Sequence, residues 1–196
     1  MMPRRGLAIG AVILFGLAAA WVLFIGLPRW FAGRQAPAAV TAGTSGGAPA
    51  DPVRKITATL YYVSEDGMAL KPVQREVPFG ATVAQQARAI VEAQLAAAAP
   101  LVSAIPAETQ LRDVYVTERG DAFIDLSGAV IAAHPGGSLD EIFTVYTLVN
   151  ALTVNLPAVT RVQILVDGKE VDTLAGHVDL RHPLAKSLEW VVHESH

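Results

Sequence analysis

The sequence lacks cysteine altogether and holds few aromatic and few charged residues. Without cysteine, the chain can form no disulfide bond, has no thiol for catalysis and offers no cysteine ligand to zinc or to an iron–sulfur cluster. The absence also removes the usual indication of redox compartment, so location must be inferred from other segments. Aromatic residues make up 7%, charged residues 17% and hydrophobic residues 52% of the chain. That hydrophobic excess comes largely from one N-terminal run, so it does not indicate several membrane spans.

The formal net charge of −3 conceals a division of the charges along the chain. Four arginines flank the N-terminal apolar run, namely Arg4, Arg5, Arg29 and Arg34. Of the 15 basic and 18 acidic residues, 11 and 17 lie from Pro52 onward, which gives that part a net charge of −6. An acidic domain repels phosphate backbones, so nucleic acid is not expected among its partners.

The N-terminal apolar run predicts a membrane anchor. Its 21 uncharged residues, from Leu7 to Leu27, form a helix long enough for a hydrocarbon core of about 30 Å. A cleaved signal peptide is the alternative, but the apolar region of such peptides is only about 7 to 15 residues long. We therefore predict a cytoplasmic head and one transmembrane signal-anchor within residues 1–31. The short basic head is expected to stay inside, which places the rest of the chain outside the cytoplasm.

Residues 32–52 are mostly Ala, Gly, Ser, Thr and Pro, a composition that cannot bury enough apolar surface to order itself. This segment predicts a flexible linker. The protein would thus be a single-pass protein of the cytoplasmic (inner) membrane, with its N-terminus inside and an extracytoplasmic or periplasmic domain.

Residues 53–183 alternate between the periodicities of strands and helices. Strands are expected where apolar and polar side chains alternate, and helices where apolar residues recur at spacings of three and four. The predicted strands cover residues 55–63, 72–77, 111–117, 122–126, 161–166 and 170–174, and the predicted helices cover residues 81–98 and 138–156. This order, ββαββαββ, predicts an α+β domain in which a mostly antiparallel or mixed sheet carries both helices on one face.

Local patterns add detail to these elements. Ser138 and Glu141 have the spacing of a capping box, in which each side chain would bind a backbone N–H at the helix start. Asp167-Gly168 is a favoured two-residue hairpin turn, and Pro72 favours an edge position for its strand. On the first helix, the apolar stripe leaves Gln94 mostly outside the buried face.

Several stretches of the domain, in their order, resemble one known family. They are Tyr61-Tyr62, Arg75, Ser103-Ala104-Ile105-Pro106, Phe123-Ile124-Asp125-Leu126-Ser127, Asn150-Ala151-Leu152-Thr153, Val166-Asp167-Gly168 and Gly176-His177-Val178-Asp179-Leu180. The family is that of the GerMN domain, named for a sporulation and spore-germination lipoprotein. The resemblance implies an extracytoplasmic, non-catalytic module of bacterial cell envelopes, related to ring-building motifs of secretion-like assemblies. The chain differs from that pattern in having a single copy of the domain and a membrane helix in place of a lipidated cysteine.

Three groups of residues could form a catalytic or metal-binding site, and each group also has a structural interpretation. His177, Asp179 and His182 are close enough in sequence to bind a divalent metal, but in an extended segment His182 would face away from the other two. Asp125 and Asp179 could form an acid–base pair, although each follows a strand where a carboxylate commonly accepts backbone N–H bonds.

Ser127 with His134 or His177 could suggest a hydrolase. No oxyanion-hole motif accompanies these residues, however. His193 and His196, at the C-terminus, lack the surroundings that orient metal ligands. We therefore predict no catalytic residue, no metal site and no cofactor.

Residues 184–196 carry apolar residues at helical spacing after Pro183, which predicts a short amphipathic helix. Such a short helix needs a surface to pack on, either its own domain or a partner. Tyr61 and Tyr62 should face opposite sides of their strand, so one of them is a candidate contact residue. The predicted interaction surface comprises Tyr61, Leu184, Leu188 and Trp190.

These observations favour a non-enzymatic envelope module that acts through protein–protein contacts, as a scaffold or assembly component. Its expected partners are envelope proteins, with the membrane contacted through residues 7–27. A binding module for peptidoglycan or another wall polymer is the alternative, and a wall hydrolase is the remote alternative.

Overall fold

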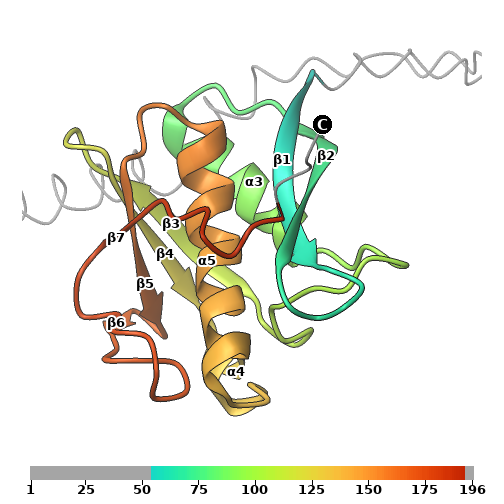
Figure 1. The fold of residues 1–196 in the computed structure, drawn as a ribbon. Coiled ribbons are helices and arrows are strands. Elements are labelled where there is room, and N and C mark those ends of the chain that lie inside the picture. The colour runs from blue at the N-terminus through green and yellow to red at the C-terminus, as the bar shows by residue number, and fades with distance from the viewer. Residues whose placement is uncertain (1–53, 193–196) are drawn as a thin grey trace, which may run out of the picture. The chain divides into compact units, whose positions relative to one another are not determined.

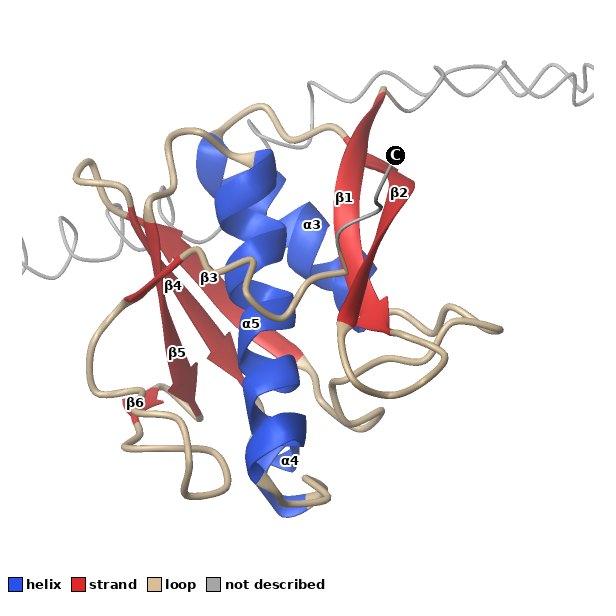
Figure 2. Cartoon of the chain, viewed as in Figure 1, coloured by secondary structure: helices blue, strands red, loops and turns tan. Residues whose placement is uncertain are grey.

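The computed structural model describes residues 54–192. These residues form an α+β unit with two sheets (Figures 1 and 2). The predicted membrane span, the predicted linker over residues 32–52, and His193 and His196 lie outside the described residues. Within residues 54–192, no helix is both long and apolar enough to cross a membrane.

The smaller sheet is a hairpin of β1 (Lys55–Val63) and β2 (Leu70–Pro78), which pair in antiparallel register. The first strand has the predicted bounds, and the second is longer than the predicted 72–77. Pro72 lies opposite Tyr61. Because proline has no N–H to donate, its place on an outer strand agrees with the edge position predicted from the sequence.

The larger sheet contains the later strands, in the order β3-β4-β5-β6, with β7 also paired to β5. Their bounds are β3 (Leu111–Val116), β4 (Asp121–Leu126), β5 (Arg161–Val166), β6 (Lys169–Glu170) and β7 (Leu184–Ala185). The β4–β5 pair is parallel and the other pairs are antiparallel. The sequence correctly predicted a mixed sheet, but the prediction of one continuous sheet was wrong.

Two long helices, α3 (Val83–Leu95) and α5 (Ser138–Asn155), lie between the two sheets (Figure 1). The connection from β4 to its parallel neighbour β5 runs through α5, as a parallel pair requires a long crossover. It also includes α4 (Ala129–Ala132), a single turn that the sequence analysis did not predict.

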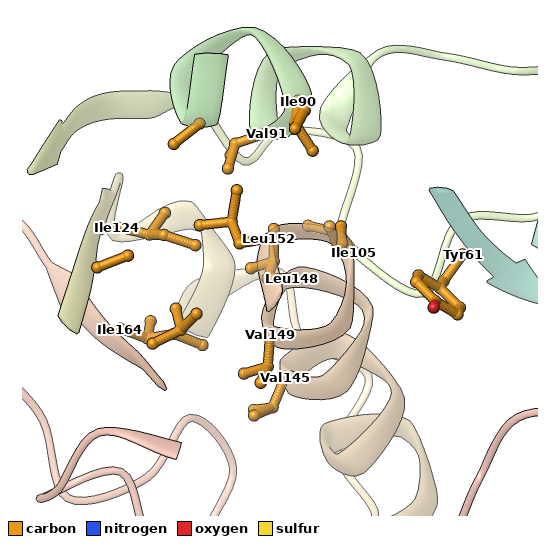
Figure 3. Close-up of a cluster of buried hydrophobic side chains, with 14 of the residues drawn as sticks. Tyr61, Ile90, Val91, Ile105, Ile124, Val145, Leu148, Val149, Leu152 and Ile164 are labelled. Carbon is orange, nitrogen blue, oxygen red and sulfur yellow. The ribbon is translucent and has the colours of Figure 1, made fainter. Parts of the chain in front are cut away.

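The apolar core fills the space between these layers, as Figure 3 shows. Leu148 and Leu152 of α5 are fully buried, with Ile90 of α3 above them and Ile124 of β4 on the sheet side. Because α5 is covered from both sheets, it buries Thr144, Thr147 and Asn150 as well as its apolar stripe. Thr144 and Asn150 bind backbone carbonyls of other segments, whereas the buried Thr147 hydroxyl has no hydrogen-bond partner within residues 54–192.

The outer edge of β1 is closed by two side-chain amides. Asn155, at the end of α5, accepts from the Thr59 N–H (2.8 Å) and donates to the Thr59 carbonyl (2.8 Å). Gln94, near the end of α3, binds the N–H and carbonyl of Tyr61 in the same way (2.9 and 2.8 Å). These amides occupy the groups that another strand would use, so at this edge β1 is held by helices rather than by the larger sheet. The prediction that Gln94 faces outward was wrong, since Gln94 is fully buried.

The predicted capping box at Ser138 was also wrong. The residue that caps α5 is Gly137, with φ of 92°, and no side-chain hydrogen bond caps this helix within the described residues. Ser138 is instead the first helical residue, and Glu141 points toward another loop. A capping box does occur at the start of α3, where Thr82 and Gln85 bind each other's backbone N–H groups (3.2 Å each).

The predicted C-terminal helix is an extended segment in the structure. Residues 184–192, here called the C-terminal strap, begin with Leu184 and Ala185 paired to β5. Further along, Asn150 of α5 donates to the Ser187 carbonyl (2.7 Å) and accepts from the Ser187 N–H (3.1 Å). The backbone groups that a helix would bond internally are thus bound by other elements.

The strap ends against the smaller sheet. Leu70 of β2 donates to the Trp190 carbonyl (2.7 Å) and accepts from the Val192 N–H (2.9 Å), which aligns Val191 with Leu70 in parallel. Figure 1 shows the strap crossing α5 on its way from β7 to the hairpin. The strap therefore joins β5, α5 and β2, so it ties the two sheets together across the helix.

Candidate functional site

The most deeply buried charged group is the carboxylate of Glu141, in the first turn of α5. Its Oε1 accepts from the Leu174 N–H (2.8 Å), and its Oε2 accepts from the His177 N–H (2.7 Å). Burial alone would raise the pKa of Glu141, but backbone N–H groups of Ala175, His177, Leu174 and Val178 outweigh it and lower the pKa. The carboxylate thus binds the main chain of one loop.

This contact explains why the predicted strand over residues 170–174 is short. The strand pairing stops at Glu170, after a turn in which Asp167 and Gly168 have φ of 51° and 76°. The turn itself was correctly predicted. Beyond it, the chain turns toward Glu141, and Leu180 donates to the Asp172 carbonyl (2.8 Å) within the same loop.

His177 lies against Glu141, with its Nδ1 3.2 Å from Oε2. A carboxylate only accepts hydrogen bonds, so Nδ1 carries the proton in this contact. A carboxylate–histidine pair becomes catalytic when a nucleophile lies within reach. Ser127, which the sequence analysis considered and rejected as a nucleophile, accepts from the Gln110 N–H (3.0 Å), and no hydrogen bond joins it to a histidine within residues 54–192.

His134, the other histidine considered with Ser127, is part of a separate network. Its Nδ1 accepts from the Gly136 N–H (3.0 Å), so in the neutral ring the proton lies on Nε2, which faces Thr144 Oγ1 (3.2 Å). Thr144 in turn contacts the Ala104 carbonyl (2.7 Å). His134 therefore fixes the loop before α5 to the segment before β3.

Asp179 is paired with its neighbour Arg181. The guanidinium donates through Nε to Oδ1 (2.9 Å) and through Nη2 to Oδ2 (2.7 Å). This side-chain contact is the main reason why the pKa of Asp179 lies well below its usual range. Among the described residues, no cluster of three metal-ligating side chains occurs at His177, Asp179 and His182 or elsewhere.

Asp125 lies at the carboxyl end of β4, where it accepts from the Gly168 N–H (2.8 Å) and from Arg112 Nε (3.1 Å). Asp167, on the hairpin turn, accepts from the Gly128 N–H (3.2 Å). A side chain at Gly128 would place its Cβ 2.7 Å from Asp167 Oδ2, so the Asp167 side chain would have to shift. The interpretation of Asp125 as a carboxylate that accepts backbone N–H bonds is confirmed.

The four residues of the predicted interaction surface are mostly covered in the structure. Tyr61 is only 2% exposed, so it offers no contact surface. Both tyrosines of β1 are buried, because the β1–β2 hairpin meets helices and loops on both faces. Leu184 and Trp190 are partly buried in the strap, and Leu188 is 37% exposed. The strap thus leaves only part of that surface accessible.

A different exposed surface lies at the turn between β1 and β2. An open hollow of about 490 Å³ is lined by this turn, by the end of β1 and by the loop after α3. Its lining residues are Val63, Ser64, Glu65, Asp66, Gly67, Lys71, Pro100, Leu101 and Val102. Val102, in the loop after α3, is 61% exposed, and Met68, in the β1–β2 turn, is 66% exposed. The sequence analysis missed this surface, although residues 93–107 form an uncharged stretch that could have indicated it.

Comparisons with known proteins give a family match and structural likenesses. The family model described as Germane, for sporulation and spore germination, matches residues 59–172. Among curated proteins, none matches the chain.

Three solved structures are similar in fold. One is a protein from Clostridium perfringens, named provisionally as a lipoprotein, with 23% identity, a TM-score of 0.49, and coverage of 71% of this chain and 93% of that chain. The first GerMN domain of the sporulation protein GerM from Bacillus subtilis has 18% identity, a TM-score of 0.48, and coverage of 68% and 98%. The tandem GerMN domains of the same protein have 17% identity, a TM-score of 0.47, and coverage of 69% and 46%.

Proposed function

The chain belongs to the Germane family of sporulation and spore germination domains, and from this premise we propose that it is a non-enzymatic module of the bacterial cell envelope that acts through contacts with other proteins. The family membership agrees with the resemblance to the GerMN domain drawn from the sequence. The proposed role is that of a scaffold or assembly component.

The observation that carries this proposal is that the conspicuous polar side chains bind the main chain of other elements. Glu141 binds the loop that contains Leu174 and His177, and Asp125 binds the turn after β5. Each of these carboxylates accepts backbone N–H groups of another element, which supports a role in holding the fold. A general acid or base instead needs a reacting group within hydrogen-bond reach.

We further infer that the protein is held at the cytoplasmic membrane. Residues 7–27 supply the apolar length of a membrane span, and residues 32–52 supply a polar, small-residue linker. As a random coil, such a linker has a reach on the order of 25 Å, which lets the domain contact proteins close to the membrane surface. A periplasm-dependent reporter enzyme fused after Gly47 should be active, and activity only in the reversed fusion would contradict this orientation.

Purification of the full chain from gently solubilised envelopes tests the proposed role. We expect the chain to elute with defined partner proteins in size-exclusion chromatography, at a larger size than the chain purified alone. Sedimentation with purified cell-wall sacculi in place of such complexes would favour wall-polymer binding. Clearing of a wall suspension by the purified full chain would show an enzyme and would refute the proposal.

A further inference from the structure

The hollow at the β1–β2 turn has an apolar wall that is held in place and exposed. Residues 93–107 carry no charged side chain, and Pro100, Leu101 and Val102 of this stretch line the hollow, with Pro100 and Val102 exposed. The Val63 N–H donates to the Val102 carbonyl (2.9 Å), which bonds this loop to the end of β1. The apolar side chains are therefore presented on a fixed backbone, so a partner would not have to order the loop.

The β1–β2 turn, which also lines the hollow, carries two carboxylates, those of Glu65 and Asp66. The Ser64 hydroxyl donates to Asp66, and the Met68 N–H also donates to it (3.1 Å); together these bonds lower the pKa of Asp66, so this carboxylate is ionised near neutral pH. Neither Glu65 nor Asp66 forms an ion pair within residues 54–192, and the same holds for Lys71, which lines the hollow beside β2. With two carboxylates and one ammonium group, the rim of the hollow has a net negative charge.

We propose that this hollow docks an extended segment of another envelope protein, in which an apolar side chain lies beside a lysine or arginine. The proposal rests on the proposed function and names the surface and the chemistry of the partner. The apolar wall at Val102 would receive the aliphatic side chain, and the carboxylates of Glu65 and Asp66 would receive the cation. The resulting contact is a small, partly exposed one, which is typical of transient association.

The charge of the chain separates this partner from other occupants. A membrane surface with anionic lipids would be repelled by Glu65 and Asp66. A second copy of the chain carries the same acidic excess from Pro52 onward and would also be repelled. A basic segment is the occupant that the rim attracts.

The experiment titrates the labelled full chain, in detergent micelles, with the capped peptide acetyl-Ala-Lys-Val-Leu-Ala-amide and follows backbone amide signals by NMR. We expect signals of Val63, Gly67 and Val102 to shift. The same peptide with glutamate in place of lysine should bind at least about fivefold more weakly, as loss of an attraction and gain of a repulsion imply. Glu65→Gln should weaken binding of the lysine peptide about two- to fivefold.

Val102→Ser removes two exposed methyl groups and should weaken binding about tenfold. Ile131→Ser, at an exposed apolar residue of α4 that does not line the hollow, is the control and should leave binding unchanged. Equal binding of the two peptides, or shifts confined to another surface, would overturn the proposal. So would association of the full chain with anionic vesicles or with itself that Val102→Ser abolishes.

These results distinguish a failure of the docking proposal from a failure of the proposed function. If envelope complexes of the full chain persist with Val102→Ser and Glu65→Gln, the chain acts through protein contacts at some other surface, and this inference fails alone. If the wild-type chain forms no such complexes, the proposed function fails as well.

Discussion

The buried carboxylate of Glu141 allows a quantitative test of how the domain is held together. Its two oxygens accept from the Leu174 N–H, the His177 N–H and the His177 ring. Glu141→Gln keeps the size of the side chain but replaces one oxygen with an NH2 group, which would face N–H donors. Hydrogen bonds to a charged group contribute about 1.5–3 kcal/mol each, and a buried donor left without a partner costs about 1–3 kcal/mol. We expect the substitution to lower the free energy of unfolding by about 2–4 kcal/mol.

The effect should also depend on pH with a definite sign. The pKa of Glu141 is lower in the folded chain than the ordinary value of 4.5. The ionised carboxylate therefore contributes stability above about pH 4.5, and this contribution is lost as the pH falls through the folded pKa. Since glutamine does not titrate, the difference between wild type and Glu141→Gln should shrink as the pH falls below about 4.5.

Urea unfolding of the full chain in mild detergent, at several pH values, measures the difference in the free energy of unfolding between wild type and Glu141→Gln. Amide hydrogen exchange at Leu174 and His177 reports on the loop itself and should become faster in the variant. Asp140→Asn is the matched control, because Asp140 is an exposed carboxylate in the same helical turn and should cost less than about 1 kcal/mol. If both variants lose the same stability, or the loss from Glu141→Gln is independent of pH, the carboxylate does not hold the loop.

Three further predictions concern the core, the strap and metal binding. Leu152→Ala should lower the free energy of unfolding by about 2–5 kcal/mol, whereas Val154→Ala, on the exposed side of α5, should cost less than about 1 kcal/mol; similar losses in urea unfolding would mean that the buried face is misplaced. Deletion of residues 185–196 should lower the melting temperature by several degrees and increase binding of an apolar dye, and an unchanged melting curve would show that the strap does not stabilise the domain. The full chain should bind neither zinc nor calcium at micromolar concentration in calorimetry, and a signal abolished by His177→Ala would refute this.

The hairpins and helices were predictable because their signals are local. Alternation of apolar and polar residues gave β1 its bounds, and Asp167-Gly168 placed the turn between β5 and β6. The two long helices were also predicted, since their apolar periodicity extends over several turns.

The errors arose where a distant segment decides the conformation. Ser138 and Glu141 fit a capping box, but a loop more than thirty residues away offers Glu141 several N–H donors, and these outweigh the single local bond. Gln94 looked like a surface residue because its amide is polar, yet the main chain of Tyr61 gives it two partners. A single sequence carries no local signal for such contacts.

The same reason explains the strap and the candidate surface. The apolar spacing after Pro183 suits a helix, but pairing with β5, Asn150 and Leu70 gives an extended chain more hydrogen bonds. The interaction residue Tyr61 was a wrong choice, because one hairpin can be covered on both faces. The hollow beside Val102 requires the turn and the loop to meet, which only the three-dimensional structure reveals.

The strap also sets an order in which the domain can be completed as the chain is made. The β1–β2 hairpin emerges first, but its outer edge waits for Asn155, 96 residues after Thr59. Its bond to the strap waits longer, because Val191 follows all the helices and strands of the domain. A chain that lacks the end of the strap therefore loses a contact to β2, so an error made late in synthesis affects a strand that was made early.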